Sequence, residues 1–160
     1  MNDYVSGLRK LIGTRPLILC GAAVVLLDKE HRVLLHHRTD NDYWGLPAGA
    51  TELGERVEET AVRETQEEVG ITCHTLELFG VYSGPELYYR YPHGDEVHNV
   101  TIVYLCRDFS GEIRVDPVEG KEARFFPIDA LPSPITPTLR VVSEDLQRRF
   151  GQILTVAEET

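Results

Sequence analysis

One segment of the chain, residues 55–69, limits what the protein can fold into more than any other. It contains neither glycine nor proline and is rich in helix formers, and Gly70 follows where a C-terminal cap belongs. The sequence therefore predicts a helix over Glu55–Val69. Its apolar residues fall on one side of a helical wheel, which we expect to be the buried face: Val57, Ala61, Val62, Thr65 and Val69.

Three carboxylates of this helix lie close together. Glu64, Glu67 and Glu68 occupy about 100° of arc, and Glu68 falls inside the apolar edge. Glu64 and Glu68 are one turn apart and repel each other, more strongly where water is partly excluded. Arg63 is expected to pair with Glu67 or Glu59, on the wrong side of the helix to neutralise the other two carboxylates. Hard divalent cations would offset the repulsion, whereas a solvated acidic face is the alternative.

The segment before this helix, Tyr43–Gly54, holds three glycines and one proline, so a loop with unusual backbone conformations is predicted. Glycine lets a chain approach a ligand closely, and the N-terminus of a helix favours anions. Loop and helix together indicate a site for an anionic ligand, although a plain tight turn would have the same composition.

At these positions the sequence resembles the box of the Nudix family, which would span residues 49–71. All the fixed positions of that motif are present at the family's spacing: Gly49, Glu55, Arg63, Glu64, Glu67, Glu68 and Gly70. Two positions depart from the usual pattern. Thr65 stands where the family usually has an aliphatic residue, and its methyl group can still pack. Ala48 stands where many members have a second glycine, and alanine keeps the backbone carbonyl that can bind metal in relatives.

The resemblance implies an α/β fold, the Nudix α/β/α sandwich with a mixed β-sheet, in a single domain over residues 1–160. It also implies an enzyme, a Nudix pyrophosphohydrolase that cleaves a nucleoside diphosphate linked to another moiety. ADP-ribose, dinucleoside polyphosphates and nucleoside triphosphates are the substrate types. Pro85 fits the marker of ADP-ribose hydrolases, and Tyr88 or Tyr89 fits that of dinucleoside polyphosphate hydrolases, so the markers do not discriminate.

For the metal site, the resemblance implies that Glu64, Glu67 and Glu68 ligate Mg²⁺ or Mn²⁺, with the carbonyl of Ala48 as a further ligand. The ions would bridge the substrate phosphates and lower the pKa of a bound water. They would also let a protein of net charge −10 hold an anionic substrate.

For catalysis, the resemblance implies that Arg63 orients Glu67 and that Glu55 supports the loop and its waters. The general base stays open. Glu64 is one candidate. Glu119, which precedes the Phe125–Phe126 strand, is another, and Glu122 is a third, weaker candidate.

Three residues outside the box are candidates for substrate contacts. Arg38, at the end of a strand, could hold a phosphate or form a surface ion pair. Trp44 and Tyr88 could stack on a base, although aromatic residues beside strands more often belong to the core. His36 and His37 are adjacent in a strand and face opposite sides, so we do not interpret them as a metal pair.

The remaining elements follow from apolar patterns. A short helix is predicted at about residues 3–12, and Leu17–Asp28 reads as a strand buried on both faces. Residues 32–38 would be its hairpin partner, and strands are expected at 72–82, 86–91, 96–107 and 121–127. Thr136 caps a final helix with Pro137 at its first position, and the helix has the apolar stripe Leu139, Val142, Leu146 and Phe150.

Charge and cysteine content limit the partners. With 26 acidic and 16 basic residues, stable nucleic-acid binding is not expected. The partner that the resemblance implies is a small nucleotide-derived substrate. Cys20, Cys73 and Cys106 form no CxxC pair, so buried free thiols in a reducing compartment are predicted. The longest apolar run is too short to span a membrane and the N-terminus lacks the apolar core of a signal peptide, which favours a soluble, cytoplasmic protein. The sequence leaves open whether the protein forms a homodimer.

Two other functions fit the same fold. One is an isomerase of a diphosphate-bearing lipid precursor, for which we would expect further ligand histidines and a base cysteine that cannot be assigned. The other is a non-hydrolytic ligand sensor. Sensors can lose box carboxylates and are usually fused to a DNA-binding domain, whereas this sequence keeps every carboxylate.

Overall fold

A mixed five-stranded sheet forms the centre of the computed structural model, which describes residues 3–151; the remaining ends of the predicted domain, 1–2 and 152–160, lie outside the described residues. Its strands run in the order β4-β1-β8-β6, and β7 also pairs with β8. Strands β1 and β8 are parallel and the other pairs are antiparallel. The bounds are β1 Leu17–Leu26, β4 Ala48–Ala50, β6 Glu77–Tyr82, β7 Tyr88–Arg90 and β8 Glu96–Cys106.

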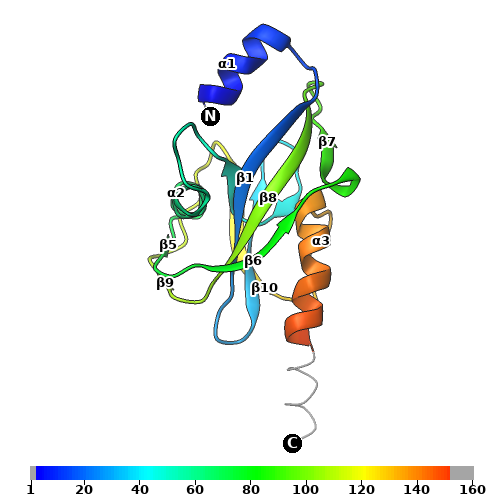
Figure 1. The fold of residues 1–160 in the computed structure, drawn as a ribbon. Helices are drawn as coiled ribbons and strands as arrows, with labels where there is room; N and C mark the ends of the chain where they lie inside the picture. The colour runs from blue at the N-terminus through cyan, green and yellow to red at the C-terminus, as the bar shows by residue number, and fades with distance from the viewer. Residues whose placement is uncertain (1–2, 152–160) are drawn as a thin grey trace, which may run out of the picture.

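A second, antiparallel sheet has the order β10-β2-β3, and a two-stranded ribbon joins β5 to β9. The bounds are β2 Arg32–Arg38, β3 Trp44–Gly45, β5 Thr72–Cys73, β9 Phe109–Ser110 and β10 Gly120–Pro127. The helices are α1 Asp3–Ile12, α2 Val57–Val69 and α3 Pro137–Leu146, with short helical turns at Pro85–Leu87 and Gln147–Gly151. Figure 1 shows α2 and α3 on opposite sides of the central strands, as the predicted α/β sandwich requires.

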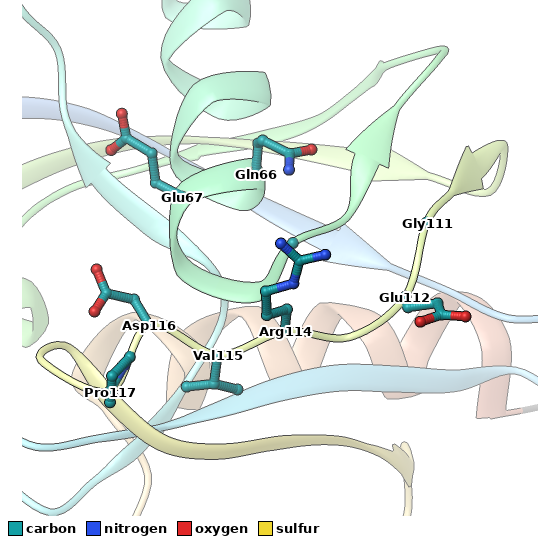
Figure 2. Close-up of a pocket in the computed structure, with 9 residues that line it drawn as sticks. Gln66, Glu67, Gly111, Glu112, Arg114, Val115, Asp116 and Pro117 are labelled. Carbon is teal, nitrogen blue, oxygen red and sulfur yellow. The ribbon is translucent and has the colours of Figure 1, made fainter.

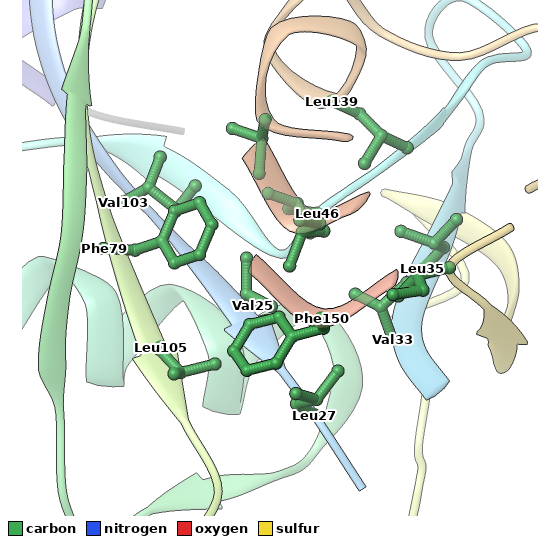
Figure 3. Packing of buried hydrophobic residues seen from close by; sticks show 14 of the residues in the cluster. Val25, Leu27, Val33, Leu35, Leu46, Phe79, Val103, Leu105, Leu139 and Phe150 are labelled. Atoms are coloured by element: carbon green, nitrogen blue, oxygen red, sulfur yellow. The ribbon is translucent and has the colours of Figure 1, made fainter. Parts of the chain in front are cut away.

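Alternation along the strands divides the core into two layers. In β1, Val25 belongs to a cluster with α3, and Val24 belongs to a cluster with α2. Figure 3 shows the first cluster, in which Phe79 and Phe150 lie beside Val25 and Leu27. The inner half of β1 is therefore buried on both faces, as predicted.

The prediction is wrong for the outer half of β1. Residues 17–21 alternate between exposed and half-buried, and Ile18 is 78% exposed, because neither α2 nor α3 extends over this part of the sheet. Cys20 lies in the same stretch and is exposed, so the expectation of a buried thiol fails there. It is confirmed for Cys73 and Cys106.

The predicted hairpin of β1 with β2 is also wrong. β2 pairs instead with β10 along its whole length and with β3. On the β1 side, the described residues show an isolated bridge from Leu27 to Val33 and a hydrogen bond from Asp28 N to Arg32 O. A tight turn at Asp28–His31 is consistent with a hairpin, but the two strands diverge after it into different sheets.

The predicted helices are confirmed with small changes. α1 spans residues 3–12, and α2 begins at Val57 rather than Glu55 and ends at the left-handed cap Gly70. Thr136 caps α3 by accepting the N–H of Leu139, and the predicted stripe is buried. Part of the expected loop 43–54 forms β3 and β4. Within residues 3–151, no helix is both long and apolar enough to cross a membrane.

Candidate active site

A groove of about 910 Å³ runs over the outer end of the central sheet, beside α2. Its volume lies within the range of sites for ligands of drug or nucleotide size. Seven of the predicted site residues line it: Arg38, Ala48, Arg63, Glu64, Glu67, Glu68 and Glu119. Trp44, Tyr88 and Glu122 are not among the lining residues.

The approach of Gly49 to α2 explains the glycine of the box. Gly49 pairs with Ala22 in the sheet, and the carboxylate of Glu64 lies directly against its α-carbon. Any Cβ at this position would collide with Glu64. The neighbouring Ala48 is not in the left-handed region, since only His31 and Asp42 among the described non-glycine residues have positive φ. Alanine therefore suits position 48 without strain.

Arg63 has partners that the helical wheel did not predict. Its Nε donates to Glu55 Oε2 at 2.7 Å, and its Nη1 donates to Glu64 Oε1 at 2.8 Å. The longer contact, 3.3 Å to Glu67 Oε2, is the predicted one. The expectation that Arg63 lies on the wrong side for Glu64 is wrong, because its long side chain bends back along the groove wall and reaches the adjacent carboxylate.

Glu55 connects the loop to this arginine. Its carboxylate also accepts the Thr60 hydroxyl and the backbone N–H of Glu52. The hydrogen bond from Arg63 is the main reason that the pKa of Glu55 lies at about 2, below its ordinary value. Glu55 is therefore an ionised anchor for the loop at neutral pH.

The two carboxylates that the sequence predicts to repel each other do so. Burial of Glu64 itself, together with the negative charge of Glu68, raises the pKa of Glu64 to about 7. Glu68 is 3% exposed. Glu67, in contrast, has a side chain that is 57% exposed. No three histidine, cysteine or acidic side chains within the described residues converge on one cation-sized point. The turn of α2 thus presents two partly desolvated carboxylates and one that is largely exposed to solvent.

Next to Glu68 lies a residue that sequence reasoning set aside. His36 is 1% exposed, and its Nδ1 is 3.2 Å from Glu68 Oε2. The two atoms are not aligned as a hydrogen bond, and Nε2 has no partner either. The sequence contained part of this information. His36 lies two residues after Leu34 in β2 and therefore on the same face of the strand, and Leu34 belongs to the core cluster with α2.

The segment 111–120 brings Glu119 to the groove. Its backbone is attached to the last turn of α2, since Arg114 N donates to Val69 O at 2.8 Å and Asp116 N to Glu68 O at 3.3 Å. Figure 2 shows the hollow of about 520 Å³ between this segment and α2, with Glu67 and Asp116 at one side of it. Burial, followed by the charge of Glu68, raises the pKa of Glu119.

The other end of the groove is aromatic. Tyr91 packs edge-on against Tyr89 at 4.9 Å and stacks on His93 at 5.4 Å, and all three line the groove. Arg38 also lines the groove and interacts electrostatically with both Tyr91 and Glu68. Burial lowers its pKa, but the bidentate pair with Asp40 and the charge of Glu68 raise it above the ordinary arginine value.

The two predicted stacking residues lie elsewhere. Trp44 is buried, with its ring parallel to His37 at 4.5 Å and edge-on to Phe126. Tyr88 donates its hydroxyl to Glu96 and contacts His98. Since successive strand residues face opposite sides, Tyr89 takes the groove side in place of Tyr88.

Fold and site together define an α/β protein with a carboxylate-lined groove at one end of a mixed sheet. The family model of the NUDIX domain matches residues 19–146, which include α2 and most of the groove. The chain belongs to the Nudix family.

Similar proteins agree with this membership. An ADP-ribose pyrophosphatase of Methanocaldococcus jannaschii is 38% identical over 110 residues, or 67% of this chain. The structure of a MutT NUDIX hydrolase from Burkholderia pseudomallei superposes with a TM-score of 0.69 at 31% identity, covering 81% of this chain and 98% of that one. The NUDIX domain of Shewanella oneidensis NrtR, solved with ADP ribose, has a TM-score of 0.65 at 19% identity over 92% of this chain and 97% of that one, and so shares the fold.

The chain spans only part of the curated relatives. The matched segments cover 61%, 35% and 44% of the proteins from M. jannaschii, Mycobacterium tuberculosis and Bacillus subtilis.

Proposed function

We propose that the protein hydrolyses the pyrophosphate bond of a nucleoside diphosphate linked to a second group, with a divalent cation held by Glu64, Glu67 and Glu68. The carrying observation is the seating of the Glu64 carboxylate against the backbone of Gly49, one helical turn from the buried Glu68. The Glu64 carboxylate thus lies beside the backbone of β4, in a groove large enough for a nucleotide.

The donor set suits Mg²⁺ or Mn²⁺. All the candidate ligands are oxygens, from three carboxylates and the carbonyl of Ala48, and hard cations prefer such oxygens. A cation would also remove the repulsion that raises the pKa of Glu64. When bound, it supplies a Lewis acid for the phosphates and lowers the pKa of an attacking water. Arg63 then positions Glu64 and Glu67 through the bonds that it already makes to both.

Glu119 is the proposed general base. It lines the groove with a raised pKa, whereas Glu122 is exposed on β10 outside it. In the proposed step, Glu119 takes a proton from water while the water oxygen forms a bond to one phosphorus. The bond from that phosphorus to the bridging oxygen breaks, and the second phosphate leaves with the electron pair. Glu64 is the alternative base.

The substrate would extend from the carboxylates past Arg38 to the aromatic end of the groove. There Tyr89 and Tyr91 offer ring faces to a nucleobase. Among the described residues, Asp40 pairs with Nε and Nη2 of Arg38, and Nη1 would be the donor to a phosphate oxygen. This arrangement replaces the predicted stacking on Trp44 and Tyr88.

We propose a nucleoside diphosphosugar of the ADP-ribose type as the substrate class. The M. jannaschii relative is an ADP-ribose pyrophosphatase, and a long groove with an aromatic end accommodates a group on each side of the diphosphate. The test is a panel of ADP-ribose, a dinucleoside polyphosphate and a nucleoside triphosphate with Mg²⁺ or Mn²⁺. We expect AMP and ribose 5-phosphate to form fastest. Release of pyrophosphate from the triphosphate as the main activity would overturn the substrate class, and no turnover of any compound would favour a ligand sensor.

A further inference from the structure

His36 is the buried group that the proposed reaction does not use. Both ring nitrogens are sequestered from water without a hydrogen-bond partner, and they are the only side-chain nitrogen or oxygen atoms in that state within residues 3–151. Burying such groups is unfavourable unless they are compensated. The burial of both uncompensated nitrogens therefore calls for a functional explanation.

The surroundings of the ring assign a separate partner to each nitrogen. Nδ1 faces Glu68 Oε2 at 3.2 Å, and because a carboxylate only accepts, Nδ1 must carry the proton to make a hydrogen bond. Nε2 lies against the α-carbon of Gly120, where any side chain would collide with the ring. The ring is therefore fixed on one side by the glycine and aimed at the carboxylate on the other.

The same oxygen of Glu68 accepts a backbone hydrogen bond. The backbone N–H of Ala48 approaches Oε2 at 3.4 Å. The hydrogen bond from Ala48 and the close approach of His36 both involve Oε2, and within the described part of the chain Oε1 makes no hydrogen bond. Gly120 follows Glu119 directly, and its segment is also attached to the backbone of Glu68 through Asp116. His36 thus lies between the carboxylate and the segment that carries the proposed base.

We propose that His36 is a positioning residue for Glu68. Its Nδ1–H holds Oε2 together with Ala48, so that Glu68 presents Oε1 to the groove as a cation ligand. A cation held by Glu68 would be supported by this contact, because partners that hydrogen-bond a ligating carboxylate fix its orientation. This inference rests on the proposed metal site, and it adds a residue from β2 that the Nudix box does not contain.

The test is the affinity for Mn²⁺ alone, measured by electron paramagnetic resonance of the free ion, together with thermal unfolding in the absence of metal. His36→Leu fills the site without a donor, and we expect Mn²⁺ binding to weaken by about 10- to 100-fold. His36→Asn places an amide N–H where Nδ1 stands and should restore the affinity. His36→Gln places it near Nε2 and should not. His37→Leu, on the opposite face of the same strand, should leave Mn²⁺ affinity unchanged.

The outcomes separate this inference from the proposed function. Wild-type protein that binds no Mn²⁺ would overturn the metal site itself. Wild-type protein that binds Mn²⁺ no more tightly than a folded His36→Leu variant would overturn the role of His36 alone. If His36→Leu does not fold, the Asn and Gln variants decide, and equal affinities would contradict the proposal.

Discussion

At the scale of single residues, the pair of Glu55 and Arg63 determines how the loop of the site responds to acid. The folded state holds the pKa of Glu55 at about 2, below its ordinary 4.5, mainly through the hydrogen bond from Arg63. Folding therefore favours the ionised form, and this stabilisation is present above pH 4.5 and is lost as the pH falls from 4.5 toward 2.

Glu55→Gln should accordingly lower the free energy of unfolding at neutral pH by roughly 1–2 kcal/mol. The difference from wild type should narrow as the pH falls through that window. Urea unfolding of both proteins across the pH range measures this. A difference that stays constant with pH would show that the carboxylate charge is not what stabilises the loop.

Gly49 provides a second prediction at this scale. In Gly49→Ala the new Cβ would meet the Glu64 carboxylate and displace it. A displacement of about 1 Å at a reacting centre costs roughly 100-fold in rate, so kcat/KM should fall by about that factor with the circular dichroism spectrum unchanged. Gly7→Ala is the control, since a Cβ there meets nothing within 4 Å. Full activity in Gly49→Ala would contradict the placement of Glu64.

The sequence was most informative about residues whose role depends on helical spacing. Glu64 and Glu68 lie where the wheel places them, and Glu68 is buried at the apolar edge as predicted. The partners of Arg63 could not be obtained in this way, because a wheel gives the direction of Cβ and not the reach of a long flexible side chain. The contact of His36 with Glu68 joins two elements, and spacing within one strand does not contain it.

At the scale of elements, the N-cap of α3 was predictable and can be tested directly. Thr136 Oγ1 accepts the N–H of Leu139 at 3.3 Å, and Pro137 stands at the first helical position. Thr136→Ala should lower the free energy of unfolding by about 1 kcal/mol, whereas Thr136→Ser keeps the acceptor and should cost less. Equal losses in the two variants, measured by denaturant unfolding, would mean that the methyl group packed near Gly45 matters more than the cap.

The pairing of the strands could not be predicted from the sequence. β2 has apolar residues on both faces, so its pattern is satisfied equally by a hairpin with β1 and by the observed pairing with β10. The register depends on what covers each face, and that is decided by α2 and α3 from elsewhere in the chain. The wrong prediction for the outer half of β1 has the same explanation, because an apolar run in one strand does not indicate how far the helices that cover the sheet extend.

At the scale of the whole molecule, the groove gathers residues from both sheets, from α1 and α2 and from the segment before β10. Sequence motifs identified one wall of it, and the aromatic end with Tyr91 and His93 emerged only from the packing of separate elements. A cation bound to the folded state alone should stabilise the entire fold.

Saturating Mn²⁺ should raise the melting temperature of the wild type, corresponding to about 2.7 kcal/mol at 100 times the dissociation constant. Chelator should reverse the effect, and Glu68→Gln should show little of it. The effect is measured by thermal denaturation with and without metal. An equal rise in the variant would place the ion elsewhere in the molecule.

The most direct test of the central claim is the rate of ADP-ribose hydrolysis by wild type and Glu68→Gln in Mg²⁺, with Glu77→Gln on the exposed edge of β6 as the matched control. We predict AMP and ribose 5-phosphate from the wild type and from the control, no products with chelator, and a rate lower by at least about 100-fold in Glu68→Gln. Turnover by Glu68→Gln at the wild-type rate, or turnover that survives removal of the metal, would contradict the assignment of this groove as the catalytic site.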